Sequence, residues 1–423
     1  MVPAVDAYYM SRVSDDAVAA VSAVLPVAGL GVVLFMPLSQ AGSSIAAQHL
    51  GAGHTEKAKR TFSLMLALNL IIGTIMSVLI FTLADKIPRF LGLETNLAVI
   101  AGQYIRILSV GNVILALRVG TSGILNALGM TRVNMWSAVL MNLINFAINH
   151  VTVTGIWGLP KLGVIGIAAA SVTAWMVAFL LGLSVCYTFM EHPRAWRGQL
   201  AELKEILRPI LNIGLPSALE PFSYQMSQVA ISSILVKISL AAVTTKAYVG
   251  NISLFSLLWT AAFASGTQIK VSHLLGARDF EGASKQLMIG LKYSWLGCTL
   301  SSLLLASLGG VLLPIFTNDP DIIRLGRIIL WVAVGLEWGR ALNVLVGSSL
   351  RASGDARFVA FFGLSVMWCV AVGGSYALGL GLGWGLVGVY IAMSIDEHTR
   401  GWVTLYRWRK GYWQSKTLYK RDS

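Results

Sequence analysis

Ionisable side chains inside apolar stretches are the residues of this sequence best suited to chemistry. The N-terminal half contains three of them, Asp6, Arg106 and Arg118. Each costs roughly 2.5 to 3.5 kcal/mol at the middle of a bilayer, so such a residue usually has a function. A carboxylate in this setting is either neutralised by an arginine or available to take up and release a cation.

Three asparagines supply polar groups that could face Asp6. Asn142, Asn145 and Asn149 follow one another at spacings of three and four, which places their amides on one stripe of a helix. A carboxylate that faces amides in a dry cavity can be loaded with a proton or another cation. We therefore expect Asp6 to be loaded with a proton or another cation, with simple pairing of Asp6 to an arginine as the alternative.

The C-terminal half has more ionisable residues in apolar stretches. They are Glu220, Lys246, Lys270, Lys292, Glu337, Arg340, Asp396, Glu397, His398 and Arg400. Glu337 and Arg340 are three apart in the sequence and can neutralise each other on one helix face. Asp396 and Arg400, four apart, can do the same. The three lysines lie near enough to helix ends for their ammonium groups to reach the membrane surface.

Motifs for catalysis, metal binding or nucleotide binding are weak. The six histidines form no close pair, and the three cysteines lie in separate apolar runs. Gly383-Trp-Gly-Leu-Val-Gly388 fits a dinucleotide-binding pattern but opens an apolar helix without a βαβ unit. The basic residues are scattered through short loops, which argues against nucleic acid. We expect no catalytic residue, no metal and no cofactor.

Composition predicts an all-α polytopic membrane protein. Hydrophobic residues make up 56% of the chain and charged residues only 12%. A membrane-spanning helix needs about 20 mostly apolar residues. Such runs lie near 17–41, 62–84, 98–126, 133–155, 164–190, 209–237, 241–269, 286–316, 326–350, 358–380 and 384–408.

A repeat organises these spans. Ile45–Ala58 resembles Lys270–Ala283 without a gap, and the same shift along the sequence, which we call the repeat offset, places Gly129 on Gly354. The repeat offset aligns Val2–Val13 with the end of the helix expected to begin near Pro209, so we interpret Val2–Val13 as the remnant of a sixth, incomplete N-terminal helix. We expect roughly 15 to 20 apolar residues to be encoded before Met1, by comparison with a full span.

Topology follows from the basic residues, which are concentrated at one set of span ends and place the C-terminus in the cytoplasm. Six spans in each half make the repeat parallel. The expected division is an N-terminal lobe of helices 1–6 over 1–190, a cytoplasmic linker over 191–208, a C-terminal lobe of helices 7–12 over 209–408, and a basic cytoplasmic tail over 409–423 whose last ten residues are loose.

The chain resembles the multidrug and toxic compound extrusion (MATE) family over almost its whole length. The resemblance rests on Val5-Asp6 with Arg12-Val-Ser-Asp-Asp-Ala-Val-Ala-Ala20, Ala47-Gln-His-Leu-Gly-Ala-Gly53, Asn145-x-x-x-Asn149 with Gly155, Gly214-Leu-Pro216, and Leu350-Arg-Ala-Ser-Gly-Asp355. It implies two six-helix lobes in a V, which export organic solutes against an inward flow of protons or sodium ions.

The resemblance also implies functional residues. Asp6 matches the first-helix aspartate that handles the coupling ion, and Asn145, Asn149 and Ser171 match its polar partners in helices five and six. The proton-coupled archaeal type has an aspartate at the position of Asn149. That difference bears on how closely a proton relay in this chain can follow the archaeal one.

Sodium-coupled members of the family carry acidic residues in helices seven and ten. Those positions are Tyr224 and Arg340 here, although Glu220 could substitute one turn earlier. With Glu337, these residues form a possible polar site in the C-terminal lobe. The resemblance thus favours protons over sodium ions as the coupling ion.

We expect a monomeric secondary antiporter in a bacterial inner membrane that exports small organic solutes and xenobiotics. The closing Gly-Trp-Gly-Leu-Val-Gly-Val and Asp396-x-x-x-Arg400 resemble a branch that includes flavin exporters, so export of flavin-like or other anionic metabolites is an alternative. A lipid-intermediate flippase of related two-lobe architecture is another. It should show extra helices or a strongly cationic central groove, and neither is evident in the sequence.

Overall fold

The structure is a computed structural model that describes residues 2–156, 160–190 and 200–419. Within these ranges every regular element is helical, and nine helices are long and apolar enough to cross a membrane. The expected all-α polytopic membrane protein is confirmed. Chain contacts divide it into two units, residues 1–46 with 56–208 and residues 47–55 with 209–423.

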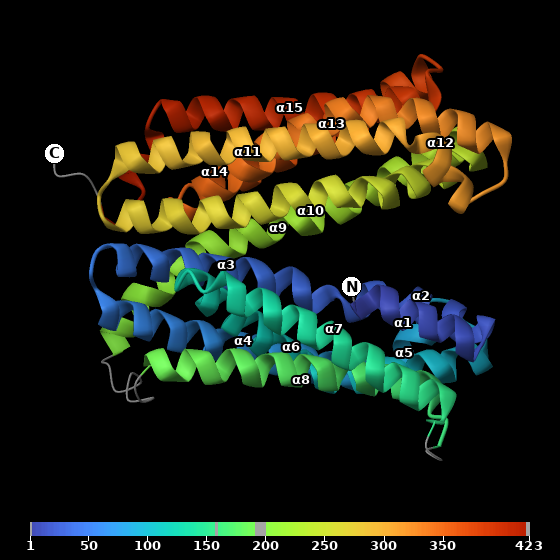
Figure 1. The fold of residues 1–423 in the computed structure, drawn as a ribbon, viewed down its shortest axis with the longest axis horizontal. Coiled ribbons are helices and arrows are strands. Elements are labelled where there is room, and N and C mark those ends of the chain that lie inside the picture. The colour runs from blue at the N-terminus through green and yellow to red at the C-terminus, as the bar shows by residue number, and fades with distance from the viewer. Residues whose placement is uncertain (1, 157–159, 191–199, 420–423) are drawn as a thin grey trace. The chain divides into compact units, whose positions relative to one another are not determined.

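The first unit is a bundle of long helices that run alongside one another (Figure 1). Its helices are α1 Val2–Val13, α2 Asp15–Ala28, α3 Leu30–Gly51, α4 Thr55–Leu83, the short α5 Lys86–Phe90, α6 Thr95–Ala127, α7 Thr131–Thr154 and α8 Gly163–Met190. The helices α2 and α3 form one span with a break at Gly29. The last turn of α3 groups with the second unit.

The second unit is a bundle of the same kind. Its helices are α9 Leu200–Ile238, α10 Leu240–Gly276, α11 Phe280–Ser307, the short α12 Gly309–Leu312, α13 Pro320–Ala352, α14 Ala356–Val366 and α15 Gly385–Arg409. Two wider helical segments, Met367–Val372 and Ser375–Gly381, continue α14. The helix α9 begins at Leu200, so part of the stretch expected as a linker is helical, and 191–199 lie outside the described residues.

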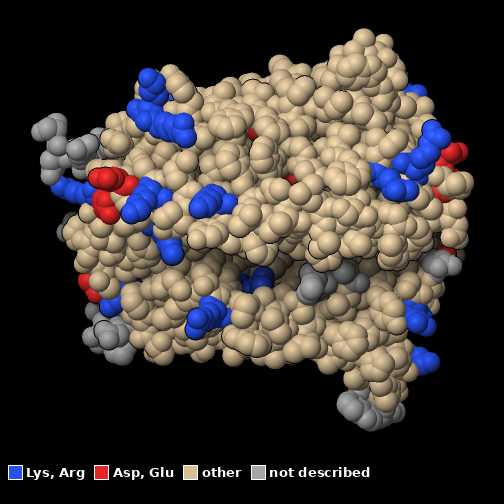
Figure 2. Space-filling view, turned by 45° about the horizontal axis from the view of Figure 1, so that its top comes forward, with Lys and Arg blue, Asp and Glu red and all other residues tan. Residues whose placement is uncertain are grey.

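Apolar side chains on the outside of the bundles fit a lipid environment. On α4, Ile71 is 55% exposed and Ile75 is 59% exposed. Uncharged residues cover most of the face in Figure 2. In water such exposed apolar side chains would be a liability, whereas lipid tails solvate them.

The predicted repeat is visible in the helix boundaries. The repeat offset carries the first residue of α6, Thr95, onto that of α13, Pro320, and it carries their last residues, Ala127 and Ala352, onto each other. Serine hydroxyls also cap the starts of α2 and α10 in the same way, because Ser14 and Ser239 each accept a hydrogen bond from the amide three positions later. An N-cap side chain satisfies a backbone amide that the first helical turn leaves unbonded.

The turn after the repeated motif also keeps its backbone conformation. Gly53 has a φ of 76° and Arg278, at the equivalent position, a φ of 59°. Left-handed backbone is easy for glycine and strained for arginine. The turn geometry therefore persists in the second copy although the residue that favours it does not.

The C-terminal segment packs against the second unit, so the expectation of a loose tail is wrong as far as residue 419. Trp413 is fully buried, and its ring stacks on Trp408 with centroids 4.3 Å apart. Lys416 forms an ion pair with Asp355. Residues 420–423 lie outside the described part of the chain.

Removing the Tyr419 hydroxyl should loosen this segment from the turn between α3 and α4. Its oxygen lies 2.8 Å from His49 Nδ1 and 2.6 Å from His54 Nδ1. Each hydrogen bond contributes about 1 kcal/mol, so Tyr419→Phe should speed amide exchange of Leu418 by roughly tenfold or more. Mass spectrometry of deuterium uptake measures this. Tyr412→Phe, at an exposed ring in the same segment, is the control, and equal uptake in the two variants would contradict the expected anchoring.

Candidate functional site

The buried carboxylate of Asp6 is enclosed by three side-chain donors in the first unit. Asn145 Nδ2 donates to Asp6 Oδ1 at 2.9 Å, and Asn149 Nδ2 donates to the same oxygen at 2.8 Å. The Ser171 hydroxyl donates to Asp6 Oδ2 at 2.5 Å. We call these four residues the Asp6 cage. Helices α1, α7 and α8 supply them.

The local structure explains why these side chains meet. Asn145 and Asn149 are one helical turn apart on α7 and both fully buried, so both amides face α1. Asn142, on the same sequence stripe, is not part of the cage, because its Nδ2 donates to the Ala138 carbonyl. A second bond, from Asn145 Nδ2 to the Ser171 hydroxyl at 3.2 Å, links α7 to α8. The structure thus brings together Asp6, Asn145 and Asn149, which their residue types and spacing single out in the sequence, and Ser171, to which the resemblance pointed.

No arginine neutralises Asp6 in the described ranges. Arg106 pairs instead with Asp85, the residue just before α5, at 2.5 Å. Arg118 forms no ion pair among the residues that the structure describes. Simple pairing of Asp6 with an arginine, the alternative expected from the sequence, is therefore not what the structure has.

An apolar pocket of about 410 Å³ lies beside the Asp6 cage within the first unit. We call it the first pocket. Its lining includes Asp6, Tyr104, Arg118, Met141, Ser171 and Trp175. This volume lies in the range of small-molecule sites, and most of the lining surface is apolar with few polar groups, as such sites usually are.

A network of buried ion pairs occupies the second unit. Arg340 pairs with Glu337, as its spacing predicts, and its Nε lies 3.7 Å from Glu397 Oε1. Arg400 pairs with Asp396 at 2.5 Å, also as predicted, and approaches Glu397 to 3.2 Å. Desolvation offsets much of the attraction within such pairs, but removing one partner leaves a buried charge uncompensated.

Glu220 belongs to this network. Arg351 Nη1 donates to its Oε2 at 2.7 Å, and Arg400 Nη1 lies 3.8 Å from its Oε1. Glu220 therefore pairs with arginines, one helical turn before Tyr224. Sequence reasoning missed Arg351, and it also missed Asn343, whose amide donates to Glu397 Oε2 at 2.7 Å. Neither contact could be predicted from residue spacing, because the two partners in each lie on helices far apart in the sequence.

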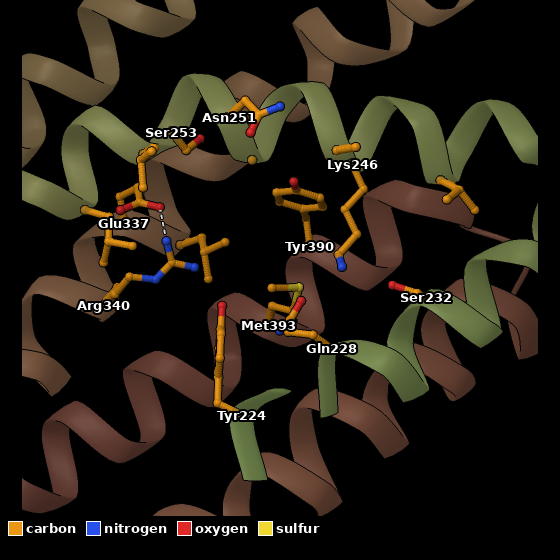
Figure 3. Close-up of a pocket in the computed structure, with 16 residues that line it drawn as sticks. Tyr224, Gln228, Ser232, Lys246, Asn251, Ser253, Glu337, Arg340, Tyr390 and Met393 are labelled. Atoms are coloured by element: carbon orange, nitrogen blue, oxygen red, sulfur yellow. Dashed lines mark hydrogen bonds and ion pairs between the residues drawn. The ribbon is translucent and has the colours of Figure 1, made fainter. Parts of the chain in front are cut away.

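A second pocket of about 330 Å³ lies inside the second unit (Figure 3). Its lining includes Tyr224, Gln228, Lys246, Glu337, Arg340 and Tyr390, from helices α9, α10, α13 and α15. Three of the four residues expected at a polar site in this half, Tyr224, Glu337 and Arg340, therefore meet here, and Glu220 does not. Lys270 and Lys292 are exposed, whereas Lys246 was expected to reach the membrane surface and lines the pocket instead.

Comparison with known proteins agrees with this architecture. The family model described as MatE matches residues 1–151 and 216–377. The uncharacterized transporter YisQ of Bacillus subtilis (strain 168) is 31% identical over 413 residues, which cover 98% of this chain and 91% of that protein. A probable multidrug resistance protein NorM of Streptococcus pneumoniae (strain ATCC BAA-255 / R6) is 25% identical over 374 residues, 86% of this chain and 80% of that protein.

Solved structures show the same fold. A crystal structure of a MATE protein in the straight conformation superposes with a TM-score of 0.86 at 20% sequence identity, and the match covers 97% of this chain and 91% of that one. Since the family model covers most of the chain and a relative 31% identical spans nearly all of it, the chain belongs to the MatE family of multidrug and toxic compound extrusion (MATE) proteins, and is a secondary active efflux transporter rather than an enzyme.

Proposed function

We propose that this transporter is a proton-coupled antiporter in which Asp6 carries the coupling proton. The observation that carries the proposal is the Asp6 cage: a buried carboxylate with three neutral donors, on the wall of an apolar pocket. A carboxylate that only stabilised the fold would be expected to pair with a cation. This one lies where its charge can change without breaking an ion pair.

The donors of the cage suit the ionised state of Asp6. All three hydrogen bonds run toward the carboxylate, which satisfies both of its oxygens. A protonated Asp6 needs an acceptor in return. Asn149 Oδ1 is buried and accepts no hydrogen bond from the residues that the structure describes, so a rotation of the Asn149 amide would present it to the new proton. Loading a proton thus rearranges the contact between α1 and α7.

The first pocket places the solute beside the same carboxylate. Asp6 and Ser171 both line it, so an organic solute in the pocket displaces water from Asp6 and changes which protonation state is favoured. Solute and proton then influence each other's binding at one site. Antiport requires this kind of thermodynamic coupling.

A proton gradient, and not a sodium gradient, should drive export. The resemblance to sodium-coupled members of the family supports this choice, because their acidic residues in helices seven and ten are replaced by Tyr224 and Arg340 here. Proteoliposomes loaded with ethidium should export it under an imposed pH gradient and should not respond to sodium at constant pH. Stimulation by sodium alone would overturn the choice of ion, and charge substitutions at Tyr224 should leave sodium dependence unchanged.

The solutes are small organic molecules that the transporter handles within a membrane, and the protein is a multi-pass bacterial membrane protein. Relatives named as probable multidrug resistance proteins support xenobiotics as the class. We further propose a monomer in the inner membrane that does not bind nucleic acid and has its C-terminus in the cytoplasm. The concentration of arginine and lysine at the span ends on that side supports this orientation.

A further inference from the structure

The two pockets occupy equivalent positions in the two copies of the repeat. Lining positions of the first pocket recur in the second at the repeat offset. Examples are Val18 with Val243, Ser22 with Ala247 and Gly29 with Leu254. One ancestral cavity is thus present twice, once in each unit, and its two versions can be compared position by position.

The comparison shows a change of polarity. Val21 in the first pocket corresponds to Lys246 in the second, and Leu115 corresponds to Arg340. The first pocket has its carboxylate at Asp6, whose counterpart is the apolar Ile231. The second pocket therefore has two basic side chains where the first has aliphatic ones, and the first has its own basic group at Arg118, whose counterpart is Asn343.

Lys246 is the basic group of the second pocket that lacks a partner. No described residue forms an ion pair or hydrogen bond with it. Each of the four acids in the buried network already has an arginine partner; these acids are Glu220, Glu337, Asp396 and Glu397. Figure 3 shows Lys246 reaching into the pocket from α10, away from the ion pair of Glu337 and Arg340.

We propose that the second pocket binds an organic anion, whose carboxylate or phosphate oxygens pair with Lys246. An ammonium inside a membrane protein is costly unless a counter-ion meets it, and the pocket is large enough to bring one. The neutral groups of Tyr224, Gln228, Asn251 and Tyr390 offer hydrogen bonds to the rest of the ligand. The proposal deepens the proposed export function, on which its physiological meaning rests, by naming a solute class.

Equilibrium binding tests the proposal without transport. The probes are 2-naphthoate, 2-naphthamide and naphthylmethylammonium, which share a ring system and differ in charge, measured by equilibrium dialysis against the purified full chain in phosphatidylcholine nanodiscs. Naphthoate should bind more tightly than naphthamide. Lys246→Met should weaken naphthoate by roughly tenfold or more and leave naphthamide unchanged, because a charge-assisted hydrogen bond is lost. Lys246→Arg should keep most of the affinity for naphthoate that Lys246→Met loses.

Control variants and probes establish whether Lys246 itself sets the preference for anions. Lys292→Met removes an exposed lysine of the same unit and should change no affinity. In Asp6→Asn, where the first pocket has lost its carboxylate, tighter binding of naphthylmethylammonium than of naphthoate would mean that the four acids set the preference and would overturn the proposal. So would an unchanged affinity in Lys246→Met.

Two further arms identify the source of the anion and separate the two proposals. Phosphatidylglycerol in the nanodiscs should compete with naphthoate if the natural anion is a lipid headgroup, and should have no effect if it is a soluble solute. In both cases the binding of naphthoate should depend on Lys246. Asp6→Asn should bind naphthoate normally while failing to couple export. Normal coupling in that variant would therefore refute the role of Asp6 and leave the anion site standing.

Discussion

Replacing Asp6 by asparagine should abolish uphill export while the protein still folds and inserts. Asparagine keeps the shape of the side chain, but it cannot exchange a proton and so cannot sense the gradient. The side chain is 6% exposed, and it accepts three hydrogen bonds from neutral groups that can also bond an amide. Ethidium flux in proteoliposomes under a pH gradient should fall to the rate of protein-free liposomes.

A second acid in the same unit provides the matched control. Asp16 is exposed at the start of α2 and lies outside the Asp6 cage, so Asp16→Asn should export at the wild-type rate. Thermal unfolding and gel filtration of both variants check folding. Wild-type uphill export by Asp6→Asn would show that the proton moves through another group.

Replacing Arg400 by methionine should have the largest effect on stability. Arg400 is 4% exposed, and Asp396, Glu397 and Glu220 all lie within 3.8 Å of its guanidinium. Removing it leaves the buried carboxylate of Asp396 without its ion-pair partner and takes a second arginine from Glu397 and Glu220, which costs about 3 to 5 kcal/mol. The thermal unfolding midpoint of the purified protein in detergent should fall strongly, and the yield in the membrane should fall with it.

A control variant at an exposed arginine and a double variant test whether the uncompensated carboxylates cause the loss of stability. Arg324→Met, on the surface of α13, should unfold close to wild type. Adding Asp396→Leu to Arg400→Met should recover part of the loss, because one uncompensated carboxylate is removed. If Arg400→Met alone unfolds like the wild type, then the network does not hold its carboxylates in the ionised form.

Much of the fold could be predicted from the sequence because the repeat signals are local. Apolar runs mark the helices, and the repeat offset recurs at helix starts such as Thr95 and Pro320. The tail could not be predicted in this way. Its basic composition suggested a loose segment, yet Trp413 finds a buried position against Trp408, and such a contact has no signature in spacing.

The candidate site shows the same contrast between signals that are local in the sequence and contacts that depend on tertiary packing. Asn145 and Asn149 are one turn apart on a single helix, so their shared face was readable from the sequence. Ser171 lies on another helix, and only resemblance pointed to it. The role of Lys246 was missed, because whether a lysine turns to the membrane surface or into a cavity depends on how α9, α10, α13 and α15 pack. Tertiary packing, not helix periodicity, decides that direction.

The equivalence of the two pockets bears on how such a transporter can evolve. Matching helix boundaries fix where the lining positions lie, while Val21 and Lys246 show that the side chains at those positions have diverged. On the assignments proposed above, a mutation in the second pocket changes which compounds are accepted and leaves the Asp6 cage untouched. Selection can therefore shift the range of exported compounds without rebuilding the machinery that converts the ion gradient into work.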